Sequence, residues 1–317
     1  MDAAAMKQTT TLGAPAWAKL SSQLVRRLPV AKYRVMNWLC KQSSPAFIES
    51  IPGSDGLLFE CDLRNGLARE VYFTGRYEPL ETELLGHVLK GGDVFVDVGA
   101  HWGYFSLLAA KMVGAKGRVV AIEADPRIHR TLARNRALNG LDQLQVVHVA
   151  AAAEAGTLTL AGFSEAEDNW GISRLVAKGS SEGTFRVPAK PLDGILDELG
   201  LDHVDLVKMD IEGAESLALE GMREGLAAGR YRRLMIELHP AQLREQGLKT
   251  SDVIALLQNA NYRGWSVNHT PKMSRRAAYG HRLTMSDILK PLEPDLEGEA
   301  WPHVVFVAPG VSPPQGV

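Results

Sequence analysis

Hydrophobic runs of strand length alternate with helical patterns through the middle of the chain. Runs rich in valine, isoleucine and leucine lie at 94–98, 118–122, 144–149, 204–209 and 234–238, and segments of helical periodicity separate the first three. Strands that are buried on both faces read as continuous apolar runs, and helices connect them when they are parallel. The pattern therefore predicts an α/β fold built on a doubly wound, mostly parallel sheet.

The interval between the third and fourth runs is too long for a simple crossover connection. It contains strand-like runs at 156–160 and 185–187 and a helical segment at 192–199, so we expect an insertion with its own strands. Nearer the C-terminus, the pattern predicts a helix over 250–260 and closing strands at 262–267 and 303–307. The polar, basic, proline-punctuated segment 268–302 between those strands is expected to form a surface loop or lid.

Two alternating runs, 57–63 and 68–73, lie on either side of an Asn65-Gly66 dipeptide. This dipeptide favours the tight turn of a β-hairpin, so we expect a hairpin here, followed by a helix from Pro79 to Leu89. The chain is therefore divided into an N-terminal helical arm (1–46), a hairpin extension (47–78) and a main domain (79–310).

The N-terminal arm combines an apolar stripe with positive charge. Trp17, Leu20, Leu24 and Leu28 recur at helical spacing, and a second helix is expected over 31–39. Between Ala3 and Ile48 there are seven basic and no acidic residues, so this segment carries +7 and leaves −9 for the rest of a chain with net charge −2. We expect the stripe to pack on the main domain. Docking on a membrane surface, an acidic substrate or a second subunit of a homodimer, and a transit-peptide role, are the alternatives.

Composition places the chain among ordinary globular proteins. With 45% hydrophobic and 23% charged residues in 317, collagen-like and wholly disordered chains are excluded. No apolar run reaches the ~18 residues of a membrane span, and the N-terminus lacks the apolar core of a secretory signal. Two cysteines, Cys40 and Cys61, form neither a disulfide framework nor a zinc-spaced cluster. We therefore expect a cytoplasmic protein.

The first run of the main domain ends in a glycine-bearing turn. The segment 97–103, Asp-Val-Gly-Ala-His-Trp-Gly, leaves the strand and precedes a helix. At the carboxyl edge of a parallel sheet, such a turn lets a ligand approach backbone N–H groups. A carboxylate at Asp97 opposes a pyrophosphate but suits a cofactor with ammonium and sulfonium charges. The spacing therefore counts against an NAD-dependent oxidoreductase, which favours Gly-x-Gly-x-x-Gly.

A second acidic residue, Glu123, ends the second run, 20 residues after Gly103. A carboxylate at this place can accept the hydroxyl groups of a ribose, as in nucleotide-binding folds generally. The adjacent Asp125-Pro126 is expected to start the next helix, with Asp125 as its N-cap and Pro126 in its first turn. The two motifs together predict a nucleoside cofactor.

In this order and spacing the motifs resemble the FkbM family of class I S-adenosylmethionine-dependent methyltransferases. The resemblance runs from about Tyr77 to Pro240 and rests on segments 96–104, 123–126, 206–215 and 236–240, together with Asn135 and Asn139. It implies a Rossmann-like methyltransferase fold with S-adenosylmethionine as cofactor. It also implies methyl transfer to hydroxyls of polyketides, sugars and related small metabolites.

The resemblance implies a set of cofactor-binding residues: Asp97, Gly99, Ala100, His101, Gly103, Glu123, Ala124, Ala150 and Asp210. The sequence departs from the family pattern after the third run, where alanines at 150–153 replace the usual acidic residue. We therefore expect backbone groups to hold the adenine. His101-Trp102 also makes the first turn bulkier than usual, and segment 169–173 in the insertion resembles a family turn that approaches the cofactor.

Polar residues end two strands that are neighbours in the methyltransferase strand order. Asp210 and Glu212 follow the fourth run, and Glu237 and His239 end the fifth. Residues two apart point to one face of a sheet, so these side chains are expected to converge. We predict that Asp210, Glu237 and His239 are catalytic, with His239 or Asp210 deprotonating the acceptor.

Two other interpretations of these strand ends stay open. Asp210, Glu237 and His239 together offer the ligands of a divalent metal, a possibility that we do not favour because such carboxylates are common without ions. In a purely structural arrangement, Glu212 and Glu215 cap or pair with the next helix while Lys208 pairs inward.

The leading hypothesis is an O-methyltransferase that acts on a small molecule. The alternatives are an N-methyltransferase acting on a peptide or amino group and a non-catalytic nucleotide-binding module. A nucleic-acid acceptor is disfavoured, because the sequence has no Asn/Asp-Pro-Pro-aromatic block and no dominant basic composition. We therefore expect the acceptor to be a small molecule or a peptide.

Overall fold

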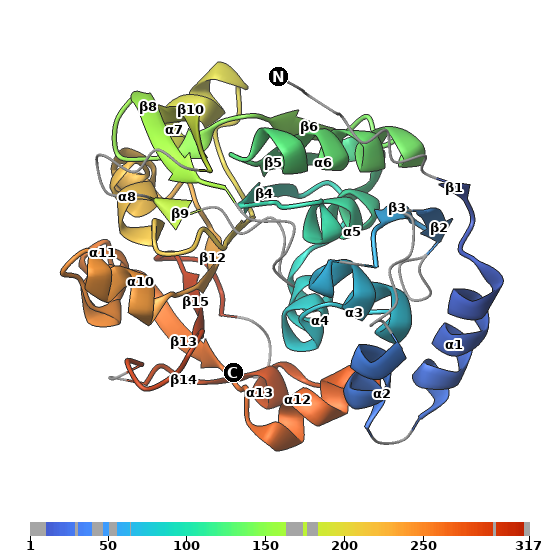
Figure 1. Cartoon of the computed structure of the whole chain (residues 1–317). Coiled ribbons are helices and arrows are strands. Elements are labelled where there is room, and N and C mark those ends of the chain that lie inside the picture. The colour runs from blue at the N-terminus through green and yellow to red at the C-terminus, as the bar shows by residue number, and fades with distance from the viewer. Residues whose placement is uncertain are drawn as a thin grey trace.

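An eight-stranded sheet forms the centre of the computed structural model, in the order β14-β13-β15-β12-β11-β4-β5-β6 (Figure 1). Five strands run parallel: β6 (Leu144–Val147), β5 (Arg118–Ile122), β4 (Val94–Val98), β11 (Leu206–Met209) and β12 (Arg233–Glu237). Strand β15 (His303–Val307) is antiparallel to β12 and to β13 (Arg263–Val267), and β14 (Leu289–Pro291) is antiparallel to β13. The predicted α/β class and the mostly parallel sheet are confirmed.

The structure describes residues 11–28, 31–39, 47–50, 56–63, 65–162, 174–175, 183–293 and 296–313. The predicted turn at 169–173 lies outside these residues, as does Cys40. Among the described helices, none combines the length and the apolar content that crossing a membrane requires.

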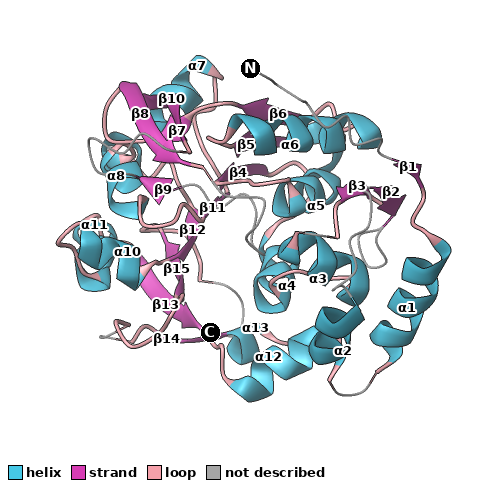
Figure 2. Cartoon of the chain, viewed as in Figure 1, coloured by secondary structure: helices cyan, strands magenta, loops and turns pink. Residues whose placement is uncertain are grey.

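Helices cover both faces of the sheet (Figure 2). Alternate residues of a strand point to opposite faces, so the strands contribute to two apolar cores, one on each face. On β4, for example, Phe95 faces one core while Val96 and Val98 face the other. The first core also takes residues from α1 (Ala16–Arg27), α2 (Lys32–Leu39), α3 (Gly66–Thr74), α4 (Pro79–Val88), α5 (Tyr104–Val113), α6 (Pro126–Asn139), α12 (Pro271–Ala278) and α13 (Met285–Ile288). The second takes them from α7 (Leu192–Glu198), α8 (Glu215–Glu220), α9 (Arg223–Ala227), α10 (Pro240–Glu245) and α11 (Thr250–Asn259).

The predicted insertion forms a separate small sheet above the carboxyl end of β6. Its strands are β7 (Ala150–Ala151), β8 (Gly156–Ala161), β9 (Arg174–Leu175) and β10 (Thr184–Lys190), in the order β7-β10-β8-β9. Strands β8 and β10 pair antiparallel along their whole length. Extra strands in this interval were predicted, and they are confirmed.

The hairpin prediction is wrong for its second strand. A third sheet contains β1 (Thr11–Leu12), β2 (Phe47–Ser50) and β3 (Leu58–Cys61), but segment 68–73 lies in helix α3. Asn65 explains the difference, because its side chain accepts hydrogen bonds from the N–H groups of Leu67 and Ala68 at 2.9 and 3.1 Å. This is N-capping, so Asn65 starts a helix here instead of turning a hairpin. The antiparallel partner of β3 is β2.

Two asparagines of α6 attach this small N-terminal sheet to the main domain. Asn139 accepts from the N–H of Leu58 and donates to its carbonyl, both at 2.8 Å, and Asn135 accepts from the N–H of Glu60 at 2.8 Å. The amide of Asn135 also donates to the carbonyl of Trp102 at 2.9 Å. The two side-chain amides therefore take the place of a neighbouring strand beside β3 and connect it to the turn after β4.

Segment 268–302 was expected to be a loop or lid, and that expectation is wrong for residues 271–278 and 285–291, which form regular elements. It contains α12, α13 and the edge strand β14, and it buries Ala277 and Ile288 in the first core. Helix α12 packs beside the N-terminal helix α2, where the ammonium group of Lys32 donates to the carbonyl of Ala278 at 2.5 Å (Figure 1). The few apolar residues of this largely polar segment therefore pack it onto the first core.

Helix α1 is present, but its predicted packing face is wrong. Leu20 and Leu24 are 63% and 67% exposed, whereas Ala18 and Val25 on the opposite side are fully buried. The guanidinium group of Arg26 donates to the carbonyl of Tyr72 in α3, on that buried side. Small side chains and one valine let α1 approach α3 closely, and the predicted apolar stripe is left facing solvent.

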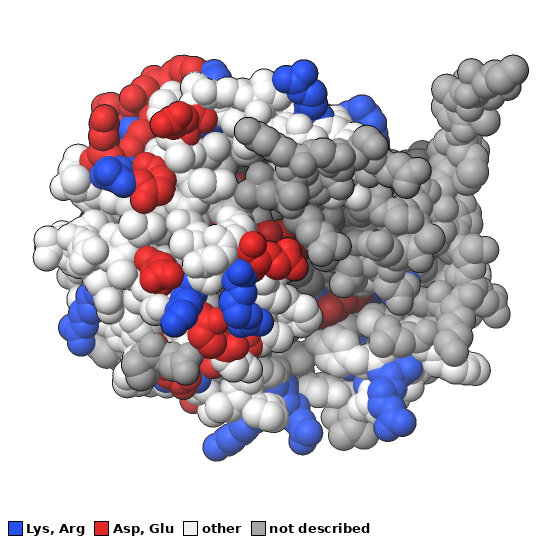
Figure 3. All heavy atoms as spheres, turned by 60° about the vertical axis from the view of Figure 1, so that its left-hand side comes forward, with Lys and Arg blue, Asp and Glu red and all other residues white. Residues whose placement is uncertain are grey.

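Charged side chains of both signs are interspersed over the face shown in Figure 3. Many make local ion pairs, such as Lys190 with Glu198 at 2.7 Å and Arg244 with Glu297 at 3.0 Å. Exposed pairs of this kind contribute little to stability. The structure is therefore held mainly by its two apolar cores.

A pair of alanine substitutions tests which face of α1 is packed. We expect Val25→Ala to lower the free energy of unfolding by about 2 kcal/mol, because it removes a buried side chain. Leu24→Ala should change it by less than about 0.5 kcal/mol, because Leu24 is mostly exposed. Urea denaturation of both variants gives the comparison. An equal loss in both would show that the exposed stripe is covered in solution.

Candidate functional site

At Gly99, the turn after β4 passes so close to the end of β11 that a side chain would have no room. Gly99 has a φ of +81°, and a Cβ atom added there would lie 1.9 Å from the carbonyl oxygen of Asp210. Gly103 has a φ of +97°, and its Cβ would lie 2.3 Å from Leu132 Cδ1. Both glycines of this turn, which we call the cradle, are therefore required by the fold: Gly99 sets the cradle against the end of β11, and Gly103 sets it against α6.

The backbone N–H groups of this turn were expected to face a ligand, and for three of them this is wrong. Gly99 and Ala100 donate to the carbonyl of Ile122 at 3.0 and 2.9 Å, and His101, at a φ of +51°, donates to Glu123 Oε2 at 2.8 Å. These bonds join the turn to the end of β5. The N–H of Gly103 also donates within the turn, to the carbonyl of Ala100 at 2.9 Å, so the groups that remain for a ligand are the carboxylates beside the turn.

Asp97 is the buried carboxylate of the cradle, 1% exposed. Ser106 donates to its Oδ2 atom at 2.5 Å, while Oδ1 has no hydrogen-bond partner. Burial raises the pKa of Asp97. A buried carboxylate oxygen without a partner is costly, so the site favours a cationic or hydrogen-bond-donating ligand group.

Glu123 lies at the end of β5, as predicted. It accepts the N–H of Asp125 at 2.7 Å in addition to that of His101, and burial raises its pKa to about 8. A carboxylate has about four acceptor positions, so further hydroxyl groups can still be bound. Asp125 caps α6 by accepting the N–H of Arg127 at 2.8 Å, with Pro126 in the first turn, so that prediction is confirmed.

Ala124 and Ala150 lie together beside the insertion. Ala150 is 8% exposed in β7 and forms a small apolar cluster with Leu160 and Val187, against which Ala124 packs. The carbonyl of Ala124 is hydrogen-bonded to the His148 ring at 3.0 Å. The role of these two alanines in holding a cofactor stays a prediction.

A buried lysine joins the cradle to the end of β11. Lys208 is opposite Asp97 in the ladder between β11 and β4, and its ammonium group lies 3.2 Å from Asp210 Oδ2 and 4.8 Å from the Phe105 ring centroid. Burial would lower its pKa, but Asp210, Glu78 and Asp97 raise it. Burial would likewise raise the pKa of Asp210, but Lys208 and His239 lower it. Both groups are therefore charged.

His239 follows β12 and is held by a carboxylate of α8. Its Nδ1 atom is hydrogen-bonded to Glu215 Oε1 at 2.7 Å, and the side chain is 1% exposed. Burial would lower the pKa of His239, but the hydrogen bond and charge of Glu215, with Asp210 and Glu212, raise it to about 9. The ring is therefore an imidazolium at neutral pH with a fixed orientation.

The structure brings the three predicted catalytic residues together. His239 Nε2 lies 3.7 Å from Asp210 Oδ1 and 3.8 Å from Glu237 Oε1, and also 3.6 Å from Glu212 Oε2. Their potential ligand atoms lie within 4.8 Å of one another. Parts of the structural alternative are present too, since Lys208 pairs inward and Glu215 accepts the N–H of Gly213 at 3.0 Å.

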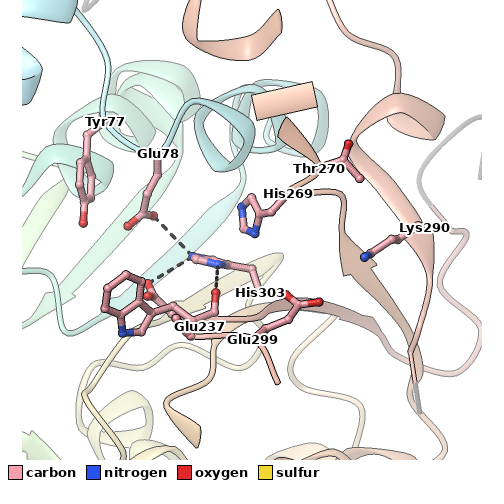
Figure 4. Close-up of a pocket in the computed structure, with 10 residues that line it drawn as sticks. Tyr77, Glu78, Glu237, His269, Thr270, Lys290, Glu299 and His303 are labelled. Carbon is pink, nitrogen blue, oxygen red and sulfur yellow. Dashed lines mark hydrogen bonds and ion pairs between the residues drawn. The ribbon is translucent and has the colours of Figure 1, made fainter. Parts of the chain in front are cut away.

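A second cluster beside these residues was not predicted. Its members are Glu78, Glu81, His269 and His303, and three of them line a cavity of about 660 Å³ together with Tyr77, Glu237, Thr270, Lys290, Glu299, Ala300 and Trp301 (Figure 4). His303 Nε2 lies 3.2 Å from Glu237 Oε2, and His269 Nε2 lies 2.7 Å from Glu81 Oε1. Glu237 therefore connects the predicted site to this cavity.

The sequence carried little signal for this cluster, because its members come from α4, from the residues after β13 and from the start of β15. The one available signal was strand pairing: an antiparallel closing strand places His303 opposite Glu237, as observed. Glu78 precedes α4 in a left-handed conformation, with a φ of +41°, which no sequence pattern announced.

Comparisons with known proteins give one family. A model described as the methyltransferase FkbM domain matches residues 97–263, about half of the chain. Methyltransferase sdnD of Sordaria araneosa is 30% identical over 163 residues, which cover 43% of this chain and 62% of that protein. The 2-O-methyltransferase NoeI of Sinorhizobium fredii is 25% identical over 181 residues, covering 53% and 72%.

A third relative is the AMB antimetabolite synthetase AmbE of Pseudomonas aeruginosa, 29% identical over 187 residues. The match covers 49% of this chain and 9% of that protein. The similarity therefore spans only part of the curated relatives.

Two glycine substitutions distinguish the energetic cost of backbone strain alone from the added cost of a steric collision at Gly99. Gly92→Ala places a side chain at a φ of +92° with nothing within 4 Å, so we expect a loss of about 1–2 kcal/mol of unfolding free energy. Gly99→Ala adds a collision with the backbone of Asp210 and should cost at least about 2 kcal/mol more. Urea denaturation measures both. Similar losses would contradict the close approach of the turn to β11.

The raised pKa of His239 predicts that stability falls with pH. Below about pH 6.5 the imidazole is protonated in both states. Between there and pH 9 only the folded state holds the proton, so this stabilisation, on the order of 3 kcal/mol, is lost as pH rises. Urea denaturation across this range should show a shallower slope in Glu215→Gln than in the unmodified protein.

The exposed histidine His281 provides the control for this measurement. His281→Gln should keep the slope of the unmodified protein, because His281 is exposed and does not contact His239 or Glu215. Identical slopes in Glu215→Gln and the unmodified protein would refute the proposed charge on His239.

Proposed function

The chain belongs to the FkbM family of S-adenosylmethionine-dependent methyltransferases, and we propose that it methylates a hydroxyl group of a small polar metabolite, such as a sugar or a polyketide-like product. The observation that carries this proposal is the pair formed by Asp210 and the Glu215-held His239, close to Glu237 in the wall of a cavity of about 660 Å³. One relative bears the name of a 2-O-methyltransferase, which supports a hydroxyl acceptor.

The cradle residues fit the cofactor. Asp97 has an unpartnered buried oxygen suited to an ammonium group, and Glu123 has capacity for ribose hydroxyls. S-adenosylmethionine supplies a methyl group on a positively charged sulfur. We assign Asp97, Gly99, Ala100, His101, Gly103, Glu123, Ala124 and Ala150 to its site, and we assign Asp210, the ninth residue of the predicted set, to the acceptor side.

Asp210 is the better placed of the two predicted bases to touch the acceptor. Its side chain is 22% exposed, whereas that of His239 is 1% exposed and lies behind it. An alcohol that gains a methyl group becomes a strongly acidic oxonium, so a carboxylate of low pKa is a sufficient proton acceptor. His239 and Lys208 keep Asp210 ionised and oriented, and His239 is thus a positioning residue in this proposal.

The cavity beside Asp210 suits a polar acceptor. Its volume is typical of small-molecule sites, and Glu78, Glu237 and Thr270 offer hydrogen-bonding groups along its wall. Trp301, 61% exposed, presents an aromatic face at the same cavity. Carboxylates beside an aromatic ring are a suitable lining for a molecule with several hydroxyl groups.

An N-methyltransferase acting on an amino group or peptide is the second candidate. The carboxylates of Glu78, Glu237 and Glu299 in the cavity wall favour it, because they attract a cationic amine. Intact-mass analysis of a panel of sugars, polyketide-like alcohols, amines and peptides separates the two. A methyl-sized gain on amines or peptides alone would replace the hydroxyl proposal.

Two variants separate the cofactor side from the acceptor side. We expect Asp97→Asn to weaken S-adenosylmethionine binding at least about tenfold in titration calorimetry, because a buried charge facing the cofactor is lost. Asp210→Asn should bind the cofactor within a few-fold of normal but turn over about 10²-fold more slowly at saturation. Normal turnover in Asp210→Asn would make the strand-end residues structural. Unchanged binding in Asp97→Asn would remove it from the cofactor site.

A further inference from the structure

Two histidines and one carboxylate meet beside the cavity, next to Glu237. Glu81 lies in the first turn of α4, His269 follows β13 and His303 begins β15. Their potential ligand atoms all lie within 4.8 Å of one another. His269 Nε2 lies 2.7 Å and His303 Nε2 3.7 Å from the same oxygen, Glu81 Oε1. The three side chains therefore converge on one point.

His303 is oriented as a ligand would be. Its Nδ1 atom lies 3.1 Å from the carbonyl of Trp301, which can only accept, so Nδ1 carries a hydrogen. Histidines that bind metals usually donate their second ring N–H to a carbonyl or carboxylate, which leaves the other nitrogen to bind the ion. The side chain is 7% exposed, and Nε2 makes no well-aligned hydrogen bond although Glu237 Oε2 is 3.2 Å away.

The charge around the three side chains also favours a cation. Glu81 is 2% exposed, and the carboxylates of Glu78 and Glu237 lie 4.0 and 3.2 Å from His303 Nε2. Burying several carboxylates in one place is unfavourable unless positive charge offsets them. Figure 4 shows the carboxylates of Glu78 and Glu237 directed at the same nitrogen of the His303 ring, with His269 beside that ring.

From these observations we infer that Glu81, His269 and His303 form a binding site for a divalent transition-metal ion, with zinc as the best match. Two imidazoles and one carboxylate form a known donor set of open zinc and iron sites. Ligand atoms that lie ~2.0–2.1 Å from one tetrahedral ion are about 3.3 Å apart. The observed 2.7 and 3.7 Å bracket this value, so only small side-chain rotations are needed.

The ion would have an open side. His269 and His303 both line the cavity, so a fourth ligand can come from water or from a molecule bound there. This site differs from the Asp210, Glu237 and His239 group that the sequence suggested, and Glu237 lies between the two. The inference concerns ion binding alone and does not depend on the proposed methyl acceptor.

Zinc retention by the full-length protein tests the site. After chelator treatment, the protein is incubated with zinc, passed through a desalting column and analysed by inductively coupled plasma mass spectrometry. We expect about one zinc per chain in the unmodified protein and at least a ~100-fold weaker affinity in His269→Gln and Glu81→Gln, which each lack one ligand. His281→Gln, which changes an exposed histidine, should retain zinc normally.

Cobalt substitution adds a readout that does not depend on activity. The unmodified protein with Co²⁺ should show visible d–d absorption of a four- or five-coordinate site, and His269→Gln should not. His269 is 30% exposed, and circular dichroism checks that its variant is folded. Zinc retention that is absent in the unmodified protein, or unchanged in both ligand variants, would overturn the site. Loss of zinc in Asp210→Asn with normal retention in His269→Gln would place the ion in the other cluster.

Discussion

The ammonium group of Lys208 is the charge on which the rest of the site depends. It is buried on a central strand, next to Asp210 and within the electrostatic reach of Asp97, Glu78 and Glu237. Buried carboxylates are unfavourable without compensating positive charge. Because β11 lies between β4 and β12, the charge of Lys208 acts on carboxylates that both neighbouring strands bring to one edge of the sheet. A cofactor side and an acceptor side can thus share a single buried cation.

At the same edge of the sheet, two buried histidines lie among carboxylates, as Lys208 does. His239 is held by Glu215, and His303 is held by the carbonyl of Trp301, with Glu237 between the two rings. His239 offsets the carboxylates around it as an imidazolium, whereas His303 belongs with Glu81 and His269 to the inferred ion site. The edge becomes a continuous row of buried charges that leads from the cradle to the cavity.

The N-terminal elements are connected to this edge by α6. Asn135 binds both the backbone of β3 and the carbonyl of Trp102, in the turn that forms the cradle. Phe59 of β3 packs on the Trp102 ring, with 5.0 Å between centroids. The small N-terminal sheet therefore supports the back of the cradle, which gives a physical role to the two asparagines of the family motif.

The sequence by itself determined the elements whose cause is local. Apolar runs buried on both faces predicted the central strands, Asp125-Pro126 predicted the start of α6, and two glycines predicted the tight cradle turn. Strand adjacency, inferred from the family resemblance, also placed Asp210 beside His239 correctly. These features depend on backbone conformation, capping and alternation, which neighbouring residues in the chain decide.

Only the tertiary structure decided what depends on distant partners. Asn65-Gly66 is compatible with a hairpin turn or a helix cap, and the packing of the following segment into the first core selected the cap. The face of α1 that is buried was set by how closely α3 can approach, and this favoured Ala18 and Val25 over larger side chains. The cluster of Glu81, His269 and His303 joins three segments far apart in sequence, so no local pattern could reveal it.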